Sequence, residues 1–170
     1  DKIISYELTP EPGIWRNSVT LVADDPLRPS RTRVEYEHIR DTEGLANILP
    51  SSMHVNKVYL TEYPEVQDPN SPYIKKPKAR DAFLQQLYNG TLMVNYLGHG
   101  SPTVWAQEEV FTASDLGLVK TGMRLPFWVA GTCDWAKYDD VNSSCVPEEL
   151  MLMENNGAVG ILSTTRKTYA

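Results

Sequence analysis

The stretch TLMVNYLGHG, residues 91–100, is the most informative about architecture. Residues 91–97 favour a β-strand whose two faces are both apolar, without the polar alternation of a half-exposed strand. Such a strand is typical of a parallel sheet that helices cover on both sides. It ends abruptly at Gly98-His99-Gly100, so it would bring a titratable side chain to the carboxyl edge of that sheet.

The same alternation continues on either side. Strands are predicted over residues 17–23, 55–61, 91–97, 126–131 and 158–164, and helices over 33–49, 76–90, 112–120 and 147–156. Five β/α alternations indicate an α/β fold with a doubly wound, mostly parallel sheet of five or six strands. Residues 1–16, with Pro10, Pro12 and Gly13, are interpreted as an entry segment with a short edge strand, and residues 17–170 as the α/β unit.

Composition narrows the function classes. The 170 residues are 41% hydrophobic and carry a net charge of −6, which suits one compact core and argues against nucleic acid as a partner. The basic stretch IKKPK, residues 74–78, is interpreted as a solvated helix start. No apolar stretch approaches the roughly 20 residues of a membrane span. Because the chain opens at Asp1, we interpret it as excised from a longer one, so a missing targeting signal excludes nothing.

Polar residues gather where the predicted strands end. In doubly wound sheets the chemistry lies beyond the carboxyl ends of the strands. In chain order these ends carry Asp24-Asp25, Glu62-Tyr63, Gly98-His99-Gly100, Thr132-Cys133-Asp134 and Ser163-Thr164-Thr165.

His99 and Cys133 follow consecutive strands of this series. If those strands are neighbours about 4.8 Å apart, imidazole and thiol share one cleft, about 3 to 6 Å from each other. An imidazole there lowers the pKa of a thiol and later protonates the leaving amine. The glycines beside His99 would permit unusual backbone angles and let a substrate approach closely. The N–H groups of Gly100 and Cys133 could form an oxyanion hole.

Single residues of these types at strand ends are more often structural, and it is their joint occurrence that favours catalysis. The second cysteine, Cys145, leaves three alternatives: a Cys133–Cys145 disulfide, two inert thiols, or one reactive thiol with a bystander. We interpret Cys145 as the bystander.

Two blocks, NYLGHGSPTVW and LPFWVAGTCDWAKYDD, resemble the gingipain family of the caspase-like clan of cysteine peptidases, and within it the PorU-type sortases of the type IX secretion system. WRNSVTLVADD and NGAVGILSTTRKTYA extend the resemblance to about residues 15–170. It implies a caspase/gingipain-like sandwich, His99 as general base and acid, and Cys133 as nucleophile. It also implies a carboxylate assisting the histidine, matched by Asp25 or Asp24. The family has Glu at that position, the clan often has Ala where Thr132 stands, and VNSSCVPEE departs from the subgroup.

The resemblance also implies a biological role. Members of this subgroup lie at the outer-membrane surface, cut a C-terminal sorting signal from exported polypeptides and can transfer the new carboxyl end to an anionic lipopolysaccharide. Such a transfer follows from a thioester intermediate, which an amine or water can resolve. Their catalytic region comprises two α/β subdomains, of which this chain has the length of one. The implied partners are a polypeptide substrate and other secretion components, with no cofactor and no metal among the site residues. A structural calcium at Asp139-Asp140, otherwise a solvated turn, is left open.

Three rival interpretations stand beside this one. A response-regulator receiver would explain the acidic end of the first strand, but it lacks the phosphoacceptor aspartate where Gly98-His99-Gly100 stands. A divalent-metal site could use Asp24, Asp25, His99 and Asp134, although their spacing fits no dedicated motif. The third rival is a catalytically inactive binding or assembly module at the cell surface that keeps the peptidase fold.

Substrate specificity is the least determined feature. Trp105 and Trp135 would flank the cleft and stack on a substrate, with capping of the core edge as the alternative. Glu35, near the start of the first helix, would form a negative pocket wall, with a solvated carboxylate as the alternative. Glu108-Glu109 is interpreted as solvated charge.

Overall fold

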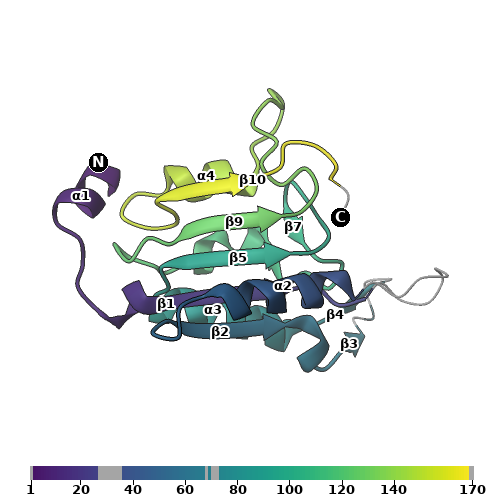
Figure 1. Cartoon of the computed structure of the whole chain (residues 1–170). Helices are drawn as coiled ribbons and strands as arrows, with labels where there is room; N and C mark the ends of the chain where they lie inside the picture. Colours follow the sequence, from purple (N-terminus) through teal and green to yellow (C-terminus); the bar gives the residue numbers. More distant parts are fainter. Residues whose placement is uncertain (1, 27–35, 68, 70–72, 169–170) are drawn as a thin grey trace.

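The computed structural model describes residues 2–26, 36–67, 69 and 73–168 (Figure 1). Its helices are α1 (Lys2–Leu8), α2 (Glu37–Ile48), α3 (Pro77–Asn89) and α4 (Val146–Leu152), with the 3-10 helices η1 (Ile14–Asn17), η2 (Leu60–Glu62) and η3 (Ala113–Leu118). Its main strands are β1 (Ser18–Ala23), β2 (His54–Tyr59), β5 (Met93–Leu97), β9 (Phe127–Gly131) and β10 (Gly160–Ser163). Short strands are β3 (Val66–Gln67), β4 (Ile74–Lys75), β6 (Gly100–Ser101), β7 (Val104–Trp105) and β8 (Phe111–Thr112). None of the described helices has the length and apolarity that a membrane crossing requires.

The main strands form one parallel sheet in the order β10-β9-β5-β1-β2 (Figure 1). The chain runs from β1 outward to β2, then crosses back to β5 and builds the other half of the sheet. The strand order therefore reverses between β1 and β5, and a doubly wound sheet opens its crevice at such a point. The ends of β1 and β5 carry Asp24 and His99.

Helices cover both faces of the sheet, as the apolar strands predict. On one face Val22 and Val94 belong to the same buried cluster as Phe83 of α3 and Leu150 of α4. On the other face, Leu21 and its strand neighbours pack against α2. The α/β sandwich expected from the sequence is thereby confirmed.

Three local features differ from expectation. Residues 2–8 form helix α1 instead of an edge strand, because Pro10, Pro12 and Gly13 all lie after its end. The helix expected over 112–120 is the 3-10 helix η3, which does begin at the Thr112–Asp115 capping box. The small antiparallel sheet β6-β7-β8 follows directly on β5 and was not anticipated.

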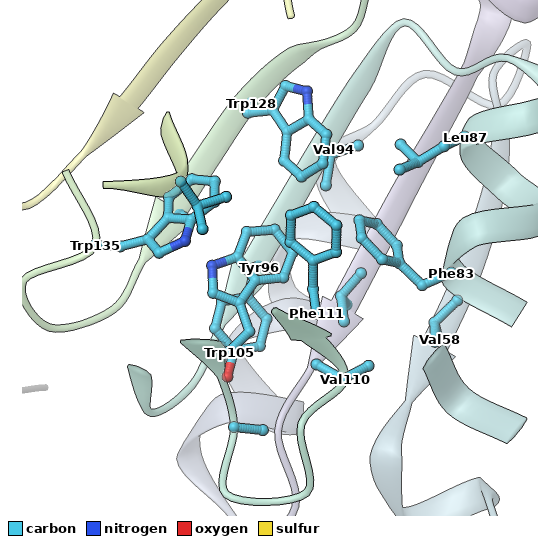
Figure 2. Packing of buried hydrophobic residues seen from close by; sticks show 14 of the residues in the cluster. Val58, Phe83, Leu87, Val94, Tyr96, Trp105, Val110, Phe111, Trp128 and Trp135 are labelled. Carbon is cyan, nitrogen blue, oxygen red and sulfur yellow. The ribbon is translucent and has the colours of Figure 1, made fainter. Parts of the chain in front are cut away.

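An aromatic cluster lies beneath this small sheet (Figure 2). Trp105 of β7 stacks on Tyr96 of β5 with ring centroids 4.3 Å apart and planes 11° apart. The ring centroid of Trp135 lies 4.7 Å from that of Trp105, and the centroid of Trp128 lies 5.6 Å from it. All four rings are fully buried. Each such pair adds about 0.5–1.5 kcal/mol to the gain from burial, so the cluster fixes the segments that follow β5 and β9.

Candidate active site

The ends of β5 and β9 lie side by side. Leu97 pairs with Gly131, so His99 and Cys133 each lie two residues beyond a matched pair on neighbouring parallel strands. The N–H of Gly98 donates to the carbonyl oxygen of Gly131 at 3.4 Å and carries the pairing past the strand ends. The two predicted residues thus reach the same edge of the sheet.

The glycines around His99 are required by close packing within the protein. A Cβ on Gly98 would overlap Asp24 and the hydroxyl of Tyr96, and a Cβ on Gly100 would overlap the hydroxyl of Thr132. Neither glycine has a positive φ, so the expected unusual backbone angles are wrong. Their role here is to let the loops after β1, β5 and β9 touch.

The main chain of His99 is held at both of its polar atoms. Its N–H donates to Asp24 Oδ2 at 2.8 Å. Its carbonyl oxygen accepts from the Tyr96 hydroxyl at 2.6 Å and from the Ala106 N–H at 2.8 Å. These contacts fix the histidine between β1 and the small sheet, in a position that needs no substrate to form.

Asp24 is a buried carboxylate, 2% exposed, at the centre of this network. Its Oδ1 accepts the N–H of Asp25 at 2.9 Å. Burial raises the pKa of Asp24 to about 8, with the hydrogen bond from His99 opposing the rise and the negative charges of Glu108 and Asp25 adding to it. The site therefore holds an acidic group that ionises near neutral pH.

Asp25 has a different partner. Its Oδ2 lies 2.5 Å from the ammonium of Lys76, which also donates to the carbonyl oxygen of Leu60 at 2.7 Å. Lys76 is only 3% exposed, so the expectation of a solvated IKKPK segment is wrong for this residue. A buried ammonium requires a countercharge, which Asp25 supplies. The assistance to His99 predicted for Asp25 stays a prediction.

His38, in the first turn of α2, was missed by the sequence reasoning. Its ring lies edge-on to that of His99, with centroids 5.2 Å apart and planes 87° apart. One ring nitrogen of each histidine and one carboxylate oxygen of Asp24 lie within 4.8 Å of one another. A signal was available: α2 follows β1, so a histidine in its first turn belongs to the same edge of the sheet.

Glu108 is the second residue that the sequence reasoning missed. One of its carboxylate oxygens lies within 4.8 Å of one from Asp24 and one from Asp25. Glu108 is half-buried there, so the interpretation as solvated charge holds for it only in part. Among the described residues, Asp134 belongs to neither group with metal-ligand spacing, so the four-residue metal site expected as a rival is not assembled.

Cys133 is half-buried, and backbone from the end of the chain lies over it. Its Sγ is 3.4 Å from both the nitrogen and the carbonyl oxygen of Thr168. Two further backbone bonds fasten the same segments: Asp134 N–H to Arg166 at 3.2 Å and Ala136 N–H to Thr164 at 3.0 Å. Residues 164–168 therefore run along the loop that presents the thiol.

Both cysteines are free, which excludes the disulfide alternative in this structure. Cys145 is 1% exposed at the start of α4, and burial raises the pKa of its thiol to about 11. A buried thiol that stays protonated is a poor nucleophile. This supports the interpretation of Cys145 as a bystander.

The predicted substrate-binding residues do not form a pocket wall. Trp105 and Trp135 are fully buried in the aromatic cluster, because their rings pack beneath the loops that were expected to display them (Figure 2). Stacking on a substrate is therefore wrong for both in this structure, and the alternative of capping the core holds. Glu35 lies outside the described residues.

The acidic pair Asp139-Asp140 forms a turn within the loop between β9 and α4. Asp139 accepts from the guanidinium of Arg166 at 2.8 Å, and this hydrogen bond lowers the pKa of the carboxyl to about 2. Asp140 accepts from the N–H of Asn142 and lies 3.1 Å from the ammonium of Lys137. Both carboxylates thus have protein partners, in keeping with a turn.

Comparison with known proteins shows which family and which folds this chain resembles. Residues 1–170 match the model of peptidase family C25. The backbone is similar to the Arg-specific cysteine proteinase gingipain R (24% identity, TM-score 0.73) and to the complex of Porphyromonas gingivalis RgpB pro- and mature domains (22%, 0.74). Each match covers 99% of this chain and 37% of the other. A third structure, of a protease, is 19% identical with a TM-score of 0.70, and the match covers 99% of this chain and 33% of that one. No curated protein sequence matches the chain.

Proposed function

The chain belongs to peptidase family C25, and from this premise we propose that it supplies the catalytic pair of a gingipain-like cysteine peptidase. Cys133 is the nucleophile, and His99 is the general base and then the general acid. The observation that carries the proposal is the pairing of Leu97 with Gly131, which sets the two residues at matched positions beyond adjacent strands. The chain spans little more than a third of the solved relatives, so the activity belongs to the longer protein.

The reaction follows from these two groups. His99 accepts the proton of the Cys133 thiol, and the sulfur forms a bond to the scissile carbonyl carbon of a polypeptide. The tetrahedral oxyanion accepts hydrogen bonds from the N–H groups of Gly100 and Cys133. The C–N bond breaks as His99 protonates the leaving amine, which leaves a thioester. Water or a second amine then attacks the thioester, gives up a proton to His99 and releases the Cys133 thiol.

We assign the carboxylate role to Asp24 in preference to Asp25. The Asp24 carboxylate lies within 4.8 Å of a ring nitrogen of His99, and it accepts the N–H of the same residue. Asp25 neutralises Lys76 instead. A carboxylate that orients the histidine acts through it, so Asp24 is a positioning residue.

The finer proposal is a sortase-like function at the outer-membrane surface. In it, the protein cleaves a C-terminal signal from exported polypeptides and passes the acyl group to an amine, alongside other secretion components. Support comes from the blocks NYLGHGSPTVW and LPFWVAGTCDWAKYDD, which resemble the PorU-type subgroup. The thioester gives this transfer a chemical basis, because an amine can resolve it in place of water.

Thiol labelling tests the catalytic pair. In the full-length protein, iodoacetamide at pH 7 is expected to modify Cys133 much faster than Cys145, and His99→Ala is expected to slow only the first reaction. Cys145 is the internal control, because it is buried and its pKa is raised to about 11. His99→Ala should also lower kcat/KM for peptide cleavage by roughly 10²- to 10⁴-fold. Equal labelling of both thiols at every pH would contradict the assignment.

Product analysis tests the sortase-like part. The full-length protein is incubated with a polypeptide bearing a C-terminal sorting signal and with an added amine, and the products are weighed by mass spectrometry. An acyl product heavier by the amine supports transfer. If only the free acid is released, the protein hydrolyses its substrate without transfer, and the sortase-like proposal is overturned.

One observation favours a second candidate, the non-catalytic module. The backbone nitrogen and the carbonyl oxygen of Thr168 both contact the Cys133 sulfur. A substrate carbonyl would have to displace the Thr168 backbone to reach the thiol. A full-length protein that binds sorting-signal peptides with equal affinity in wild-type and Cys133→Ala forms, and turns over neither, would establish this module instead.

A further inference from the structure

Two imidazoles and a buried carboxylate converge at the switch point of the sheet. Asp24 follows β1, His38 lies in the first turn of α2, and His99 follows β5. One ligand atom from each lies within 4.8 Å of the other two. They come from three separate elements, so tertiary folding alone assembles this set.

The ring geometry suits a shared metal ion. The His38 and His99 centroids are 5.2 Å apart with perpendicular planes. Two imidazoles bound to one tetrahedral zinc, with Zn–N bonds of about 2.0–2.1 Å, place their ring centroids about 5 Å apart. Two histidines with one carboxylate form a donor set that zinc sites use, with a fourth position left to water.

The charges around the set favour a cation. Asp24 shares a second group, again within 4.8 Å, with Asp25 and Glu108. The ammonium of Lys76 neutralises Asp25, and Glu108 is the one further carboxylate that this second group adds beside Asp24. Asp24 is also preorganised, because its two oxygens already accept the N–H groups of Asp25 and His99. Carboxylate oxygens retain lone pairs for a metal in addition to such bonds.

We propose that Asp24, His38 and His99 form a zinc site that switches the peptidase off. A neutral imidazole has a single acceptor nitrogen, and once zinc takes it the ring cannot accept the proton of Cys133. Zinc binding itself is independent of catalysis, whereas its inhibitory effect rests on the function proposed above.

Direct zinc binding tests the site, in the full-length protein carrying Cys133→Ala so that this thiol is not a ligand. Titration with zinc against a chromophoric chelator is expected to show one site that His38→Ala weakens by at least about 10- to 100-fold. His54 offers the matched control, because it is the one histidine of this chain outside the proposed site and is exposed at the start of β2. His54→Ala should retain the affinity of the parent. Equal loss in both variants, or in neither, would overturn the site.

Three further measurements identify the zinc ligands, control for folding and test the inhibitory effect. X-ray absorption of the zinc-loaded wild-type protein should show nitrogen and oxygen neighbours, and a sulfur neighbour would overturn the site in favour of Cys133. His38→Gln, with its fold checked by near-UV circular dichroism, repeats the titration in case His38→Ala does not fold. An active wild-type protein should lose peptidase activity on zinc addition and regain it with EDTA. Undiminished turnover at saturating zinc would overturn the inhibitory role alone.

Discussion

The loops after β5 and β9 present the two halves of one proposed catalytic pair, and they share the aromatic cluster through Trp105 and Trp135. They differ in what holds the residues of the pair themselves. Buried Asp24 and Tyr96 bond the main chain of His99 on both sides. The loop around Cys133 is held in addition by backbone bonds to residues 164–168 and by an exposed ion pair between Arg166 and Asp139. The base is therefore fixed by buried groups, whereas the loop of the nucleophile also depends on a segment at the surface.

Substitution of the buried lysine should have the largest effect on this difference. Lys76→Met leaves Asp25 without its countercharge in a site where the two side chains are 4% and 13% exposed. We expect a loss of about 3–5 kcal/mol in the free energy of unfolding, measured by urea denaturation. The adjacent Lys75 pairs with Glu109 in a far more exposed position, so Lys75→Met should cost less than about 1 kcal/mol. Equal losses would mean that burial does not distinguish the two pairs.

The pH dependence of stability should differ in sign between the two loops. Asp24 has a pKa of about 8 in the folded protein, against about 3.9 when unfolded, so the folded state holds more protons between these values. Stability contributed by this group therefore falls as pH rises from about 4 to 8. Asp24→Asn keeps an oxygen to accept the His99 N–H, gives up the bond from the Asp25 N–H, and removes this fall. Its stability relative to wild type should therefore rise by about 5 kcal/mol between pH 4 and pH 8, measured as Tm against pH.

Asp139 provides the opposite case. Its pKa is lowered to about 2 by Arg166, so its contribution to stability is present above about pH 4 and is lost as pH falls through 2. Asp139→Asn should therefore be slightly less stable than wild type at neutral pH and equal to it near pH 2. A parallel pH profile for the Asp24 and Asp139 variants would contradict the comparison.

A methyl group on Gly98 should moderately destabilise the loop that carries His99. Gly98→Ala pushes a Cβ into Asp24 and the hydroxyl of Tyr96, at a cost of about 1–3 kcal/mol. Because the displaced residue precedes His99, peptide cleavage should slow as well. Gly117 of η3 has open space around it, so Gly117→Ala is the control and should leave both stability and cleavage near wild type.

The smallest effect should come from the nucleophile side. Arg166→Ala removes an ion pair whose side chains are 62% and 55% exposed, so the free energy of unfolding should change by no more than about 1 kcal/mol. The change should instead appear as faster alkylation of Cys133, since residues 164–168 lose one of their attachments. Unaltered labelling would show that the backbone bonds hold this segment without the guanidinium.

The sequence could predict the strand ends because four of the main strands are largely apolar and polar residues follow within one or two positions of their ends, while β2 (HVNKVY) is a more polar edge strand. His99, Cys133 and the acidic pair were found from that signal alone, and the five strands confirm it. The resemblance to gingipains then implied the catalytic role of His99 and of Cys133. Hydrophobic patterns alone do not indicate such roles.

The rest depended on tertiary contacts without a periodic signal. Trp105 follows His99 closely, but the strands of the small sheet are too short to show alternation, so its burial could not be anticipated. Lys76 precedes Pro77 in a basic stretch and resembles a solvated helix start, and only the placement of Asp25 explains why it is buried. His38 lies 61 residues before His99, and their contact requires α2 to be placed over β1 and β5.

The aromatic cluster gives the protein a near-ultraviolet circular dichroism signal that depends on the loops after β5 and β9. Trp105, Trp128 and Trp135 lie within 4.7–6.0 Å of one another, and all four tryptophans of the chain are shielded from solvent. Closely spaced indoles in a rigid, asymmetric setting produce intense near-ultraviolet circular dichroism, which vanishes when packing loosens. Since Trp105 belongs to the histidine side and Trp135 to the cysteine side, this signal reports whether the two halves of the site remain together, without any added dye.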